Sequence, residues 1–514
     1  MKSSFKQAFF LAAILGGPVG LHAGPVEDLD AWLKTARASR PVLASQTFAD
    51  AALTASECAK ARDLIWTDRI AFVKSEWASQ WAGKILVNKD NLQMPFDYRI
   101  YGSKPAQGYD LYISMHGGGE TTKAENDAQW RNQIILYHPN GVYLAPRAPT
   151  DAWNMWHKDH IDGFFDQIIQ LCVANLGANA DRVYLMGYSA GGDGAYQMAP
   201  RMADRWAASA MMAGYPNNAS PLNLRNIGFS MDVGALDASF GRNTIAATYG
   251  KEMQKLQDAD PGFYKYRVLA HPGKPHWMDL EDTVALSWID DFTRHPFPAK
   301  VVWRQDTTVG TNSFPSAGPV VPVKGRPTQY QFHWIGLQER KPPAAPVNVT
   351  AEIKGQEVGI VDASIDSLVV LLSDSLLNLD KPVRVLWKGK PVYEGTPPRT
   401  IANLYQTAQD RGDRAYLYPV ILKVAKSGQV SLRPGPERTF ARVKAEGGSL
   451  AISFAGVRTS GRARLSDISG VLRCETLFSN SANTELPLRG LRSGMYIVSV
   501  RADGIRSDQP FFLP

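Results

Sequence analysis

The chain of 514 residues is 44% apolar and 20% charged, with 43 glycines and 33 prolines, which excludes disordered, collagen-like and coiled-coil proteins. Its formal charge of +7 is mild, and because no run of Lys or Arg marks a basic face, we expect no nucleic-acid partner. Three cysteines, Cys58, Cys172 and Cys474, permit one disulfide at most and lack the spacing of zinc ligands.

Residues 1–23 have the pattern of an export signal. Lys2 and Lys6 precede an apolar run from Ala8 to Val19, and Leu21-His22-Ala23 has the small final residue of a cleavage site. The run is too short to span a bilayer, and no other apolar stretch reaches that length. We therefore expect a secreted or periplasmic protein without a transmembrane segment, with association at the cell surface as a further option.

The spacing of apolar residues divides the rest of the chain into four regions. Residues 24–90 carry Leu, Ile, Phe and Trp at helical spacing, notably over 26–38 and 49–81, which predicts a helical N-terminal region. Residues 91–297 alternate between short apolar strands and helical segments, which predicts an α/β domain: a mostly parallel sheet with helices on both faces. The strands are expected over 111–115, 141–144, 182–186, 207–212, 227–233 and 266–270, and the helices over 163–175, 191–202, 244–257 and 280–293.

After residue 297 the helical spacing largely stops. Pro342, Pro343 and Pro346 precede alternating segments that predict antiparallel strands, among them 347–353, 368–372 and 383–387, with one helix near 401–409. We expect a β-rich accessory domain over 298–426. A small β-sandwich is expected over 440–514.

The sequence Gly187-Tyr188-Ser189-Ala190-Gly191 follows an apolar strand and precedes a helical segment. Strand, G-x-S-x-G and helix in this order define a nucleophile elbow, in which small residues allow a tight turn that exposes the serine hydroxyl. The start of the helix also places backbone N–H groups and a positive dipole end beside the serine. The sequence therefore predicts Ser189 as a catalytic nucleophile.

A glycine-rich loop, His116-Gly117-Gly118-Gly119, follows the strand expected over 111–115. In a fold with a nucleophile elbow, this loop donates one N–H to the oxyanion and the residue after the nucleophile donates the other. We therefore expect an oxyanion hole formed by Ala190 with Gly118 and Gly117. His116 precedes the nucleophile in the chain, so we expect it to be structural.

A serine nucleophile needs a base and a carboxylate that orients the base, and in this fold both follow the serine in the chain. The candidate acids are Asp232 and Asp237, of which Asp237 is favoured because it lies beyond the end of a strand and Asp232 lies inside it. The candidate bases are His271, His276 and His295. His276 is favoured because it lies in the loop between the last strand and the last helix, with His271 as the fallback.

Trp153, Trp156 and His157 follow the strand expected over 141–144, at the carboxyl ends of the strands, where open α/β sheets bind ligands. One interpretation is a substrate-binding surface that stacks on sugar or aryl rings. The other is that the tryptophans cover the core. His157 and His160 have no partner set at ligand spacing, so we expect no metal site.

The stretch 184–214, the HGGG loop and His276-Trp277-Met278 resemble exported bacterial α/β-hydrolases of the polyhydroxybutyrate-depolymerase-like and feruloyl or acetyl-xylan esterase group. The resemblance runs from about residue 111 to 297 and implies the triad Ser189, Asp237 and His276. The segment from 463 to 498 resembles C-terminal β-sandwich sorting domains of secreted bacterial enzymes, which implies contact with export machinery or the cell surface; a carbohydrate-binding module is the alternative.

Together these patterns predict a secreted serine hydrolase with an α/β-hydrolase core. We expect it to cleave carboxylic esters, with acyl or feruloyl esters on polysaccharide as substrates, through a Ser-His-Asp acyl-enzyme mechanism that requires no metal or cofactor. No lid domain fits between Ser189 and His276, so the cleft is expected to be open to a polymer. A secreted serine peptidase, a polyester depolymerase and a binding protein with an inactive core are the alternatives.

Overall fold

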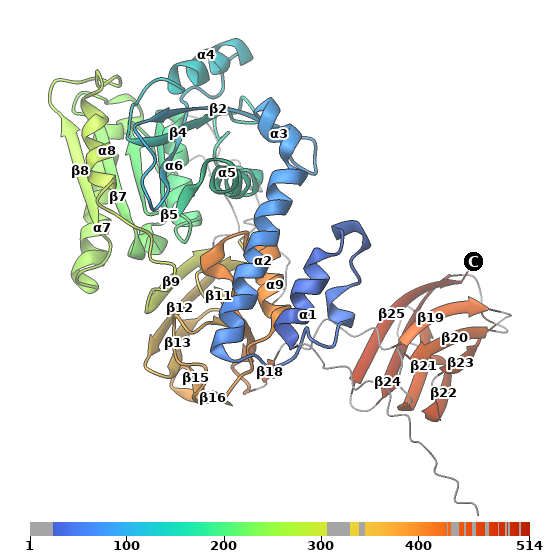
Figure 1. The fold of residues 1–514 in the computed structure, drawn as a ribbon. Coiled ribbons are helices and arrows are strands. Elements are labelled where there is room, and N and C mark those ends of the chain that lie inside the picture. The colour runs from blue at the N-terminus through green and yellow to red at the C-terminus, as the bar shows by residue number, and fades with distance from the viewer. Residues whose placement is uncertain are drawn as a thin grey trace, which may run out of the picture.

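The structure is a computed structural model of the chain (Figure 1). It describes residues 24–305, 329–338, 345–428, 430–432, 441–446, 449–454, 459–467, 472–481, 483–488, 491, 494–502 and 505–513. The export signal expected over 1–23 lies outside the described residues.

The centre of the molecule is an eight-stranded sheet with the order β1-β2-β4-β3-β5-β6-β7-β8. Its strands are β1 (Ile85–Val87), β2 (Gln93–Tyr101), β3 (Tyr109–Met115), β4 (Gly141–Pro146), β5 (Ala178–Tyr188), β6 (Ala208–Met212), β7 (Gly228–Gly234) and β8 (Tyr266–His271). β2 is antiparallel to β1 and β4, and all other neighbours are parallel. This arrangement confirms the predicted α/β-hydrolase core.

Helices cover both faces of this sheet, as predicted. They are α4 (Lys123–Gln133), α5 (His160–Leu176), α6 (Ala190–Arg201), α7 (Arg242–Ala259) and α8 (Val284–Ile289). Leu111 and Leu185 pack with side chains of α5, α6 and α7, whereas Tyr112 and Tyr184 pack with α8 on the other face. Neighbouring residues of one strand therefore enter opposite cores, as the two-residue period of a strand requires.

Some elements differ from the prediction, among them β2 and α4, which were not expected as a strand and a helix. β1 lies within the region 24–90, which was expected to be helical. The strand was not predicted because three residues are too few to show an alternating pattern. The helix expected over 280–293 is the shorter α8, preceded by the 3₁₀ turn Glu281–Thr283. Asp279 and Leu280 have φ values of 52° and 65°, a left-handed conformation that cannot continue into an α-helix.

The N-terminal helices are α1 (Pro25–Lys34), α2 (Ala55–Glu76) and α3 (Ala78–Gly83). α2 contacts both α5 of the α/β core and α9 (Ile401–Arg411) of the accessory region. Arg69 of α2 shows this bridging directly: its Nη2 donates to Gln170 Oε1 at 2.7 Å and its Nη1 to Gln409 Oε1 at 3.1 Å. α2 thus joins the two regions (Figure 1).

The accessory region contains two five-stranded sheets, with the orders β10-β11-β14-β17-β18 and β16-β15-β13-β12-β9. Their strands are β9 (Lys300–Gln305), β10 (Gln331–Phe332), β11 (Ile335–Gly336), β12 (Val347–Lys354), β13 (Glu357–Ala363), β14 (Ser367–Leu372), β15 (Val383–Trp387), β16 (Lys390–Gly395), β17 (Val420–Ala425) and β18 (Val430–Leu432). Buried residues of both sheets form one continuous cluster with buried residues of the α/β core.

Buried ion pairs also cross this boundary. Asp413 Oδ2 lies 2.6 Å from Arg294 Nη1 and 2.9 Å from Arg205 Nη1, and Arg411 Nη2 lies 2.6 Å from Asp204 Oδ2. Removing one partner of such a pair leaves a buried charge uncompensated. The accessory region is therefore packed against the α/β core through buried contacts rather than tethered to it.

The C-terminal part contains a three-stranded and a four-stranded sheet, β19-β20-β23 and β22-β21-β24-β25. Their strands are β19 (Ala441–Glu446), β20 (Ser449–Phe454), β21 (Thr459–Asp467), β22 (Leu472–Ser481), β23 (Asn483–Pro487), β24 (Gly494–Ala502) and β25 (Ile505–Leu513). Leu450 and Ile452 of one sheet pack with Leu465 and Val498 of the other. The role expected for this module, in sorting or binding, stays a prediction.

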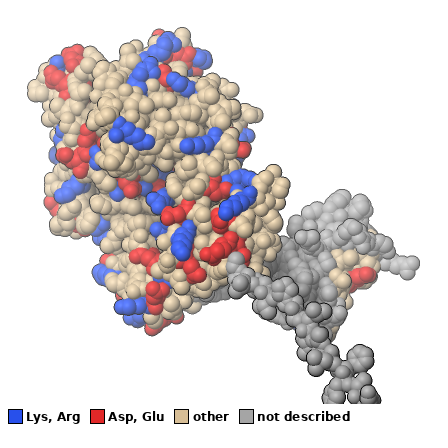
Figure 2. All heavy atoms as spheres, viewed as in Figure 1, with Lys and Arg blue, Asp and Glu red and all other residues tan. Residues whose placement is uncertain are grey.

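On the face shown in Figure 2, Lys and Arg are interspersed with Asp and Glu. None of the described helices is both long and apolar enough to cross a membrane. Cys58 and Cys172 are buried free thiols, and Cys474 is a half-buried one.

Candidate active site

The nucleophile elbow is formed by the junction of β5 and α6. Ser189 has φ 57° and ψ −120°, a strained conformation for a residue with a side chain, and its N–H donates to Met212 O at 2.9 Å. A Cβ on Gly187 would lie 2.1 Å from Gly191 O, and one on Gly191 would lie 2.1 Å from Met115 O. Only glycine fits at either position, so the motif is required by the packing of the turn.

Ser189, His276 and Asp237 form a continuous hydrogen-bonded chain. His276 Nε2 lies 2.9 Å from Ser189 Oγ, and His276 Nδ1 lies 2.7 Å from Asp237 Oδ2. Asp237 is 2% exposed, whereas the His276 side chain is 40% exposed. The three residues follow β5, β7 and β8, so the carboxyl ends of parallel strands bring them together, as sequence analysis expected.

The alternative acid and base form a different pair. Asp232 and His271 contact each other inside the sheet, with 3.2 Å between Asp232 Oδ1 and His271 Nε2. Asp232 also accepts from Ser230 Oγ at 2.6 Å, and its hydrogen bond to His271 is the main reason that the pKa of His271 is raised. The third candidate base, His295, is exposed. The imidazole that contacts Ser189 Oγ is that of His276.

The glycine loop lies against the nucleophile. A Cβ on Gly117 would lie 3.2 Å from Ser189 Cβ, and Gly118 has φ 102°. The N–H of Gly119 donates to Asn126 Oδ1 at 2.8 Å, which leaves Gly117 and Gly118 as the loop residues with N–H groups for an oxyanion. Ala190 begins α6, and the first N–H groups of a helix have no acceptor within it.

Asn126 is a residue that sequence reasoning missed. It is fully buried, and its Nδ2 donates to the carbonyls of Thr121 and Thr122 while its Oδ1 holds the loop. Its place just inside α4, after the capping box of Thr122 and Glu125, gave no sign of contact with the glycine loop.

His116 is structural, as its position before the nucleophile suggested. Its Nδ1 donates to Gly117 O at 2.6 Å and its Nε2 accepts from Ala148 N–H at 3.1 Å. Burial lowers the pKa of His116 to about 3, so the ring is neutral and keeps one donor and one acceptor. It thereby ties the glycine loop to the end of β4.

The expected stacking surface is wrong for Trp156 and His157. Trp156 is 0% exposed and His157 is 1% exposed, so neither ring can face a substrate. Trp156 Nε1 instead donates to His116 O at 3.0 Å, and its ring meets the His116 ring edge to face. Burial lowers the pKa of His157 to about 3. Trp153 is half-buried, and its backbone lies against Gly119.

Two charged residues behind the triad were also missed. Arg242, at the start of α7, is 8% exposed and its Nη1 lies 3.6 Å from Asp237 Oδ1. Asp193 of α6 accepts from Tyr215 N–H at 2.6 Å, and burial raises its pKa to about 7. Arg242 thus places a buried positive charge beside the expected catalytic acid.

Apolar side chains surround the two loops that carry the acid and the base. Leu236 is 63% exposed, Phe240 is 55% exposed and Trp277 is 44% exposed. The loops are adjacent, since Leu236 N–H donates to Lys274 O at 2.9 Å, and the Trp277 ring lies 5.5 Å from that of Tyr188. These three residues are exposed apolar side chains on or next to the loops that carry Asp237 and His276, and they are called the apolar rim below.

Within the described part of the chain, no group of three or more His, Cys, Asp or Glu residues is arranged to hold a metal ion. The expectation that catalysis needs no metal or cofactor stays a prediction.

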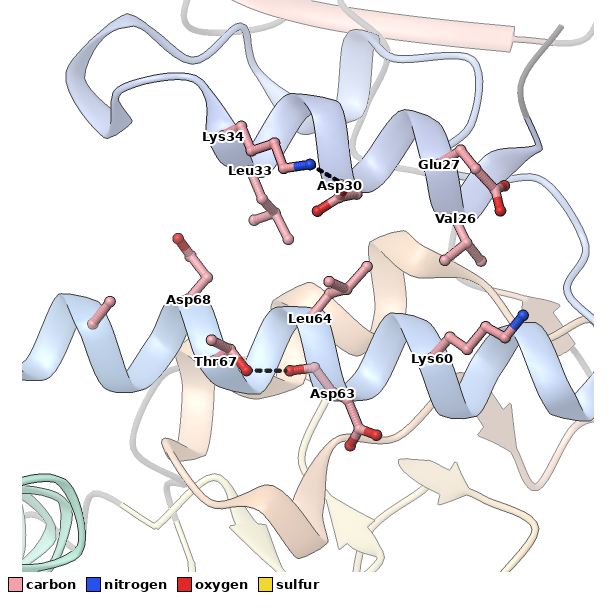
Figure 3. A pocket seen from close by; sticks show the side chains of 11 residues that line it. Val26, Glu27, Asp30, Leu33, Lys34, Lys60, Asp63, Leu64, Thr67 and Asp68 are labelled. Carbon is pink, nitrogen blue, oxygen red and sulfur yellow. Dashed lines mark hydrogen bonds and ion pairs between the residues drawn. The ribbon is translucent and has the colours of Figure 1, made fainter.

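A cavity of about 680 Å³ lies between α1 and α2 (Figure 3). Its lining comes from the N-terminal helices alone and includes none of the triad residues.

No family model and no curated protein matches the chain. Among solved structures, it is similar to a thermostable esterase, with 18% identity and a TM-score of 0.33 over 41% of this chain and 62% of that one. It is also similar to the feruloyl esterase module from Clostridium thermocellum, with 15% identity and a TM-score of 0.30 over 40% of this chain and 86% of that one. For a ferulic acid esterase the identity is 17% and the TM-score 0.29, over 40% of this chain and 94% of that one. At these low values the functional proposal rests on the site itself.

Proposed function

We propose that the protein is a carboxylic ester hydrolase that uses Ser189, His276 and Asp237 as a catalytic triad. The observation that carries the proposal is the hydrogen-bonded chain itself, with 2.9 Å from serine oxygen to imidazole and 2.7 Å from imidazole to carboxylate. Nucleophile, base and orienting acid within hydrogen-bonding reach are the signature of nucleophilic acyl transfer.

In the first half of the reaction, Ser189 Oγ attacks the ester carbonyl while His276 Nε2 takes the hydroxyl proton. Asp237 holds the Nδ1 proton of the imidazole and stabilises the imidazolium that forms. The oxyanion of the tetrahedral intermediate accepts hydrogen bonds from Ala190 N–H and the N–H groups of Gly117 or Gly118. Collapse of the intermediate expels the alkoxide, which takes the proton from His276 and leaves as the alcohol.

The acyl-enzyme is then hydrolysed through the same groups. Water attacks the acyl carbonyl while His276 Nε2 removes its proton, and the second intermediate collapses to free acid as the proton returns to Ser189 Oγ. The net reaction consumes one ester and one water and yields one acid and one alcohol.

For the substrate, we propose acyl or feruloyl esters attached to polysaccharide. The exposed rim of Leu236, Phe240 and Trp277 supports a bulky apolar or aryl group beside the triad, because aromatic and aliphatic side chains gain free energy when a ring covers them. The half-buried Trp153 beside the glycine loop remains available as a second contact. We propose that this rim, rather than the buried Trp156, binds the ring of the substrate.

A matched substrate panel tests this proposal: p-nitrophenyl acetate, feruloylated and acetylated xylo-oligosaccharides, polyhydroxybutyrate and peptide anilides. We expect ester turnover that Ser189→Ala abolishes. Trp277→Ala should raise KM for the feruloyl ester about tenfold and leave p-nitrophenyl acetate unchanged. Phe263→Ala is the control, since Phe263 is 39% exposed and packs on Arg225. Fast anilide turnover without ester turnover would assign a peptidase, and fast polymer turnover a depolymerase.

We also propose that the protein is exported and that its C-terminal module contacts export machinery or the cell surface. The support is the signal-like pattern of residues 1–23 and the resemblance of the segment from 463 to 498 to sorting domains. Mass spectrometry of protein recovered from outside the cytoplasm should find Gly24 as the first residue. Deletion of 440–514 should change where the protein accumulates while esterase activity persists, and retention of an intact N-terminus would contradict export.

A further inference from the structure

Tyr188, the residue before the nucleophile, contacts the backbone of the loop that carries the base. Its hydroxyl donates to His276 O at 2.6 Å and accepts from Met278 N–H at 3.0 Å. Tyr188 is 7% exposed, and its ring lies 6.0 Å from the His276 ring and 5.5 Å from the Trp277 ring. One phenol oxygen thus satisfies two peptide groups on either side of Trp277.

The loop between β8 and α8 is also held by the hydrogen bond from Leu236 N–H to Lys274 O and by the ion pairs of Lys274 with Asp279 and Glu281. His276 belongs to no helix or strand, and its side chain is 40% exposed, so surrounding side chains do not enclose the imidazole. A phenol can bridge a carbonyl and an N–H group because it is donor and acceptor at once, which phenylalanine cannot be. Burial also raises the pKa of the Tyr188 phenol, so it keeps its proton and its donor role across the working pH range.

We propose that Tyr188 is a positioning residue that holds the His276 loop at the distance from Ser189 that proton transfer requires. The proposal rests on the triad function proposed above. Because Tyr188 is covalently joined to Ser189, the nucleophile and the backbone of the base share one anchor. A residue of the G-x-S-x-G motif therefore sets the distance between the imidazole and the serine oxygen.

The test compares Tyr188→Phe with Tyr184→Phe in the full chain. Tyr184 is a matched control: it lies on the same strand, is fully buried, and its hydroxyl donates to Phe292 O at 2.9 Å. A misplacement of about 1 Å costs on the order of 100-fold in rate, so we expect Tyr188→Phe to lower kcat about 10- to 100-fold with KM nearly unchanged. Tyr184→Phe should keep the wild-type kcat while losing a similar amount of thermal stability.

Hydrogen exchange gives a second readout that does not depend on activity. The Met278 amide should be protected in the wild-type protein, should exchange faster in Tyr188→Phe, and should be unaffected in Tyr184→Phe. Rapid exchange of this amide in the wild type would overturn the proposal even if the variant failed to fold. Equal kcat in the two variants would overturn it too, and inactivity of the wild type towards every ester would instead refute the triad function.

Discussion

Two Asp–His pairs lie close together in this molecule, and both have the same sequence separation of 39 residues. Asp232 and His271 meet inside the sheet, where Asp232 is 0% and His271 4% exposed. Asp237 and His276 meet on the loops beyond the strand ends, where the His276 side chain is 40% exposed. The spacing of the residues therefore does not separate the pair that we propose to be catalytic from the other pair; their position relative to the strand ends does.

The surroundings explain the difference. His271 lies between Asp232 and Glu281, and Arg267 also contacts Asp232, so this pair belongs to a network of charges that holds β7, β8 and the following turn together. His276 has a carboxylate on one side and a serine hydroxyl on the other. Only the second arrangement leaves one imidazole nitrogen to take a proton from a nucleophile.

The largest expected effect separates the two histidines. His276→Ala should lower kcat by about four orders of magnitude or more, because it removes the base. His271→Ala, which deletes the histidine of the structural pair, should lower kcat less than about tenfold and reduce the melting temperature. Steady-state kinetics on one activated ester and a thermal melt of each variant measure both quantities. Comparable losses of kcat would remove the distinction between the pairs.

The two acids give the next comparison. Asp237→Asn should lower kcat by roughly 10³- to 10⁴-fold, since an amide no longer holds the required imidazole tautomer. Asp232→Asn keeps the side-chain shape and should cost activity little, with its effect seen in the free energy of unfolding. If Asp232→Asn is the crippling change and Asp237→Asn is mild, the triad acid is Asp232.

A smaller effect is expected behind the triad acid. Arg242 lies 3.6 Å from Asp237 Oδ1 and both side chains are buried. Arg242→Met should lower kcat about tenfold with little change in KM, because the buried carboxylate loses its neighbouring cation. Arg225→Met is the control, because Arg225 makes a similar ion pair with Asp260 away from the triad. This variant should keep the wild-type kcat. Equal kcat in both variants would show that Arg242 does not support Asp237.

The smallest effect is a pH dependence of stability. The hydrogen bond to Asp232 raises the pKa of His271 above its ordinary value of 6.5, so the folded state binds this proton more tightly than the unfolded state. The stabilisation is fully present below that value and is lost as the pH rises through the folded-state pKa. Urea unfolding of wild type and His271→Asn should differ more near pH 6 than near pH 8.5. The exposed His295, changed to Asn, should show no such trend.

Much of the fold and the arrangement of the site followed from local patterns. Alternation of strands and helices predicted the parallel sheet, and the elbow motif together with the strand ends selected Ser189, Asp237 and His276, which the structure places in one hydrogen-bonded chain. Their catalytic role stays a prediction. These features could be read because each depends on residues close in sequence, or on the rule that parallel strands end at one edge.

The remaining features depend on partners far along the chain. Tyr188 bonds to a carbonyl 88 residues away, and Arg294 pairs with Asp413 across 119 residues, which is why the union of the core and accessory regions was not visible. The prediction for Trp156 was wrong because an indole with an apolar body occurs both in cores and on binding surfaces. Its burial and its hydrogen bond to the His116 carbonyl identify it as a support of the glycine loop.

Covalent labelling of the purified protein with a fluorophosphonate, followed by peptide mapping, tests the triad most directly. A serine becomes reactive only when a base takes its proton, so we expect one labelled peptide that carries the probe on Ser189. Labelling should be lost in Ser189→Ala and strongly slowed in His276→Ala but not in His271→Ala. Labelling that persists in Ser189→Ala, or a folded wild-type protein that takes up no probe, would contradict the triad.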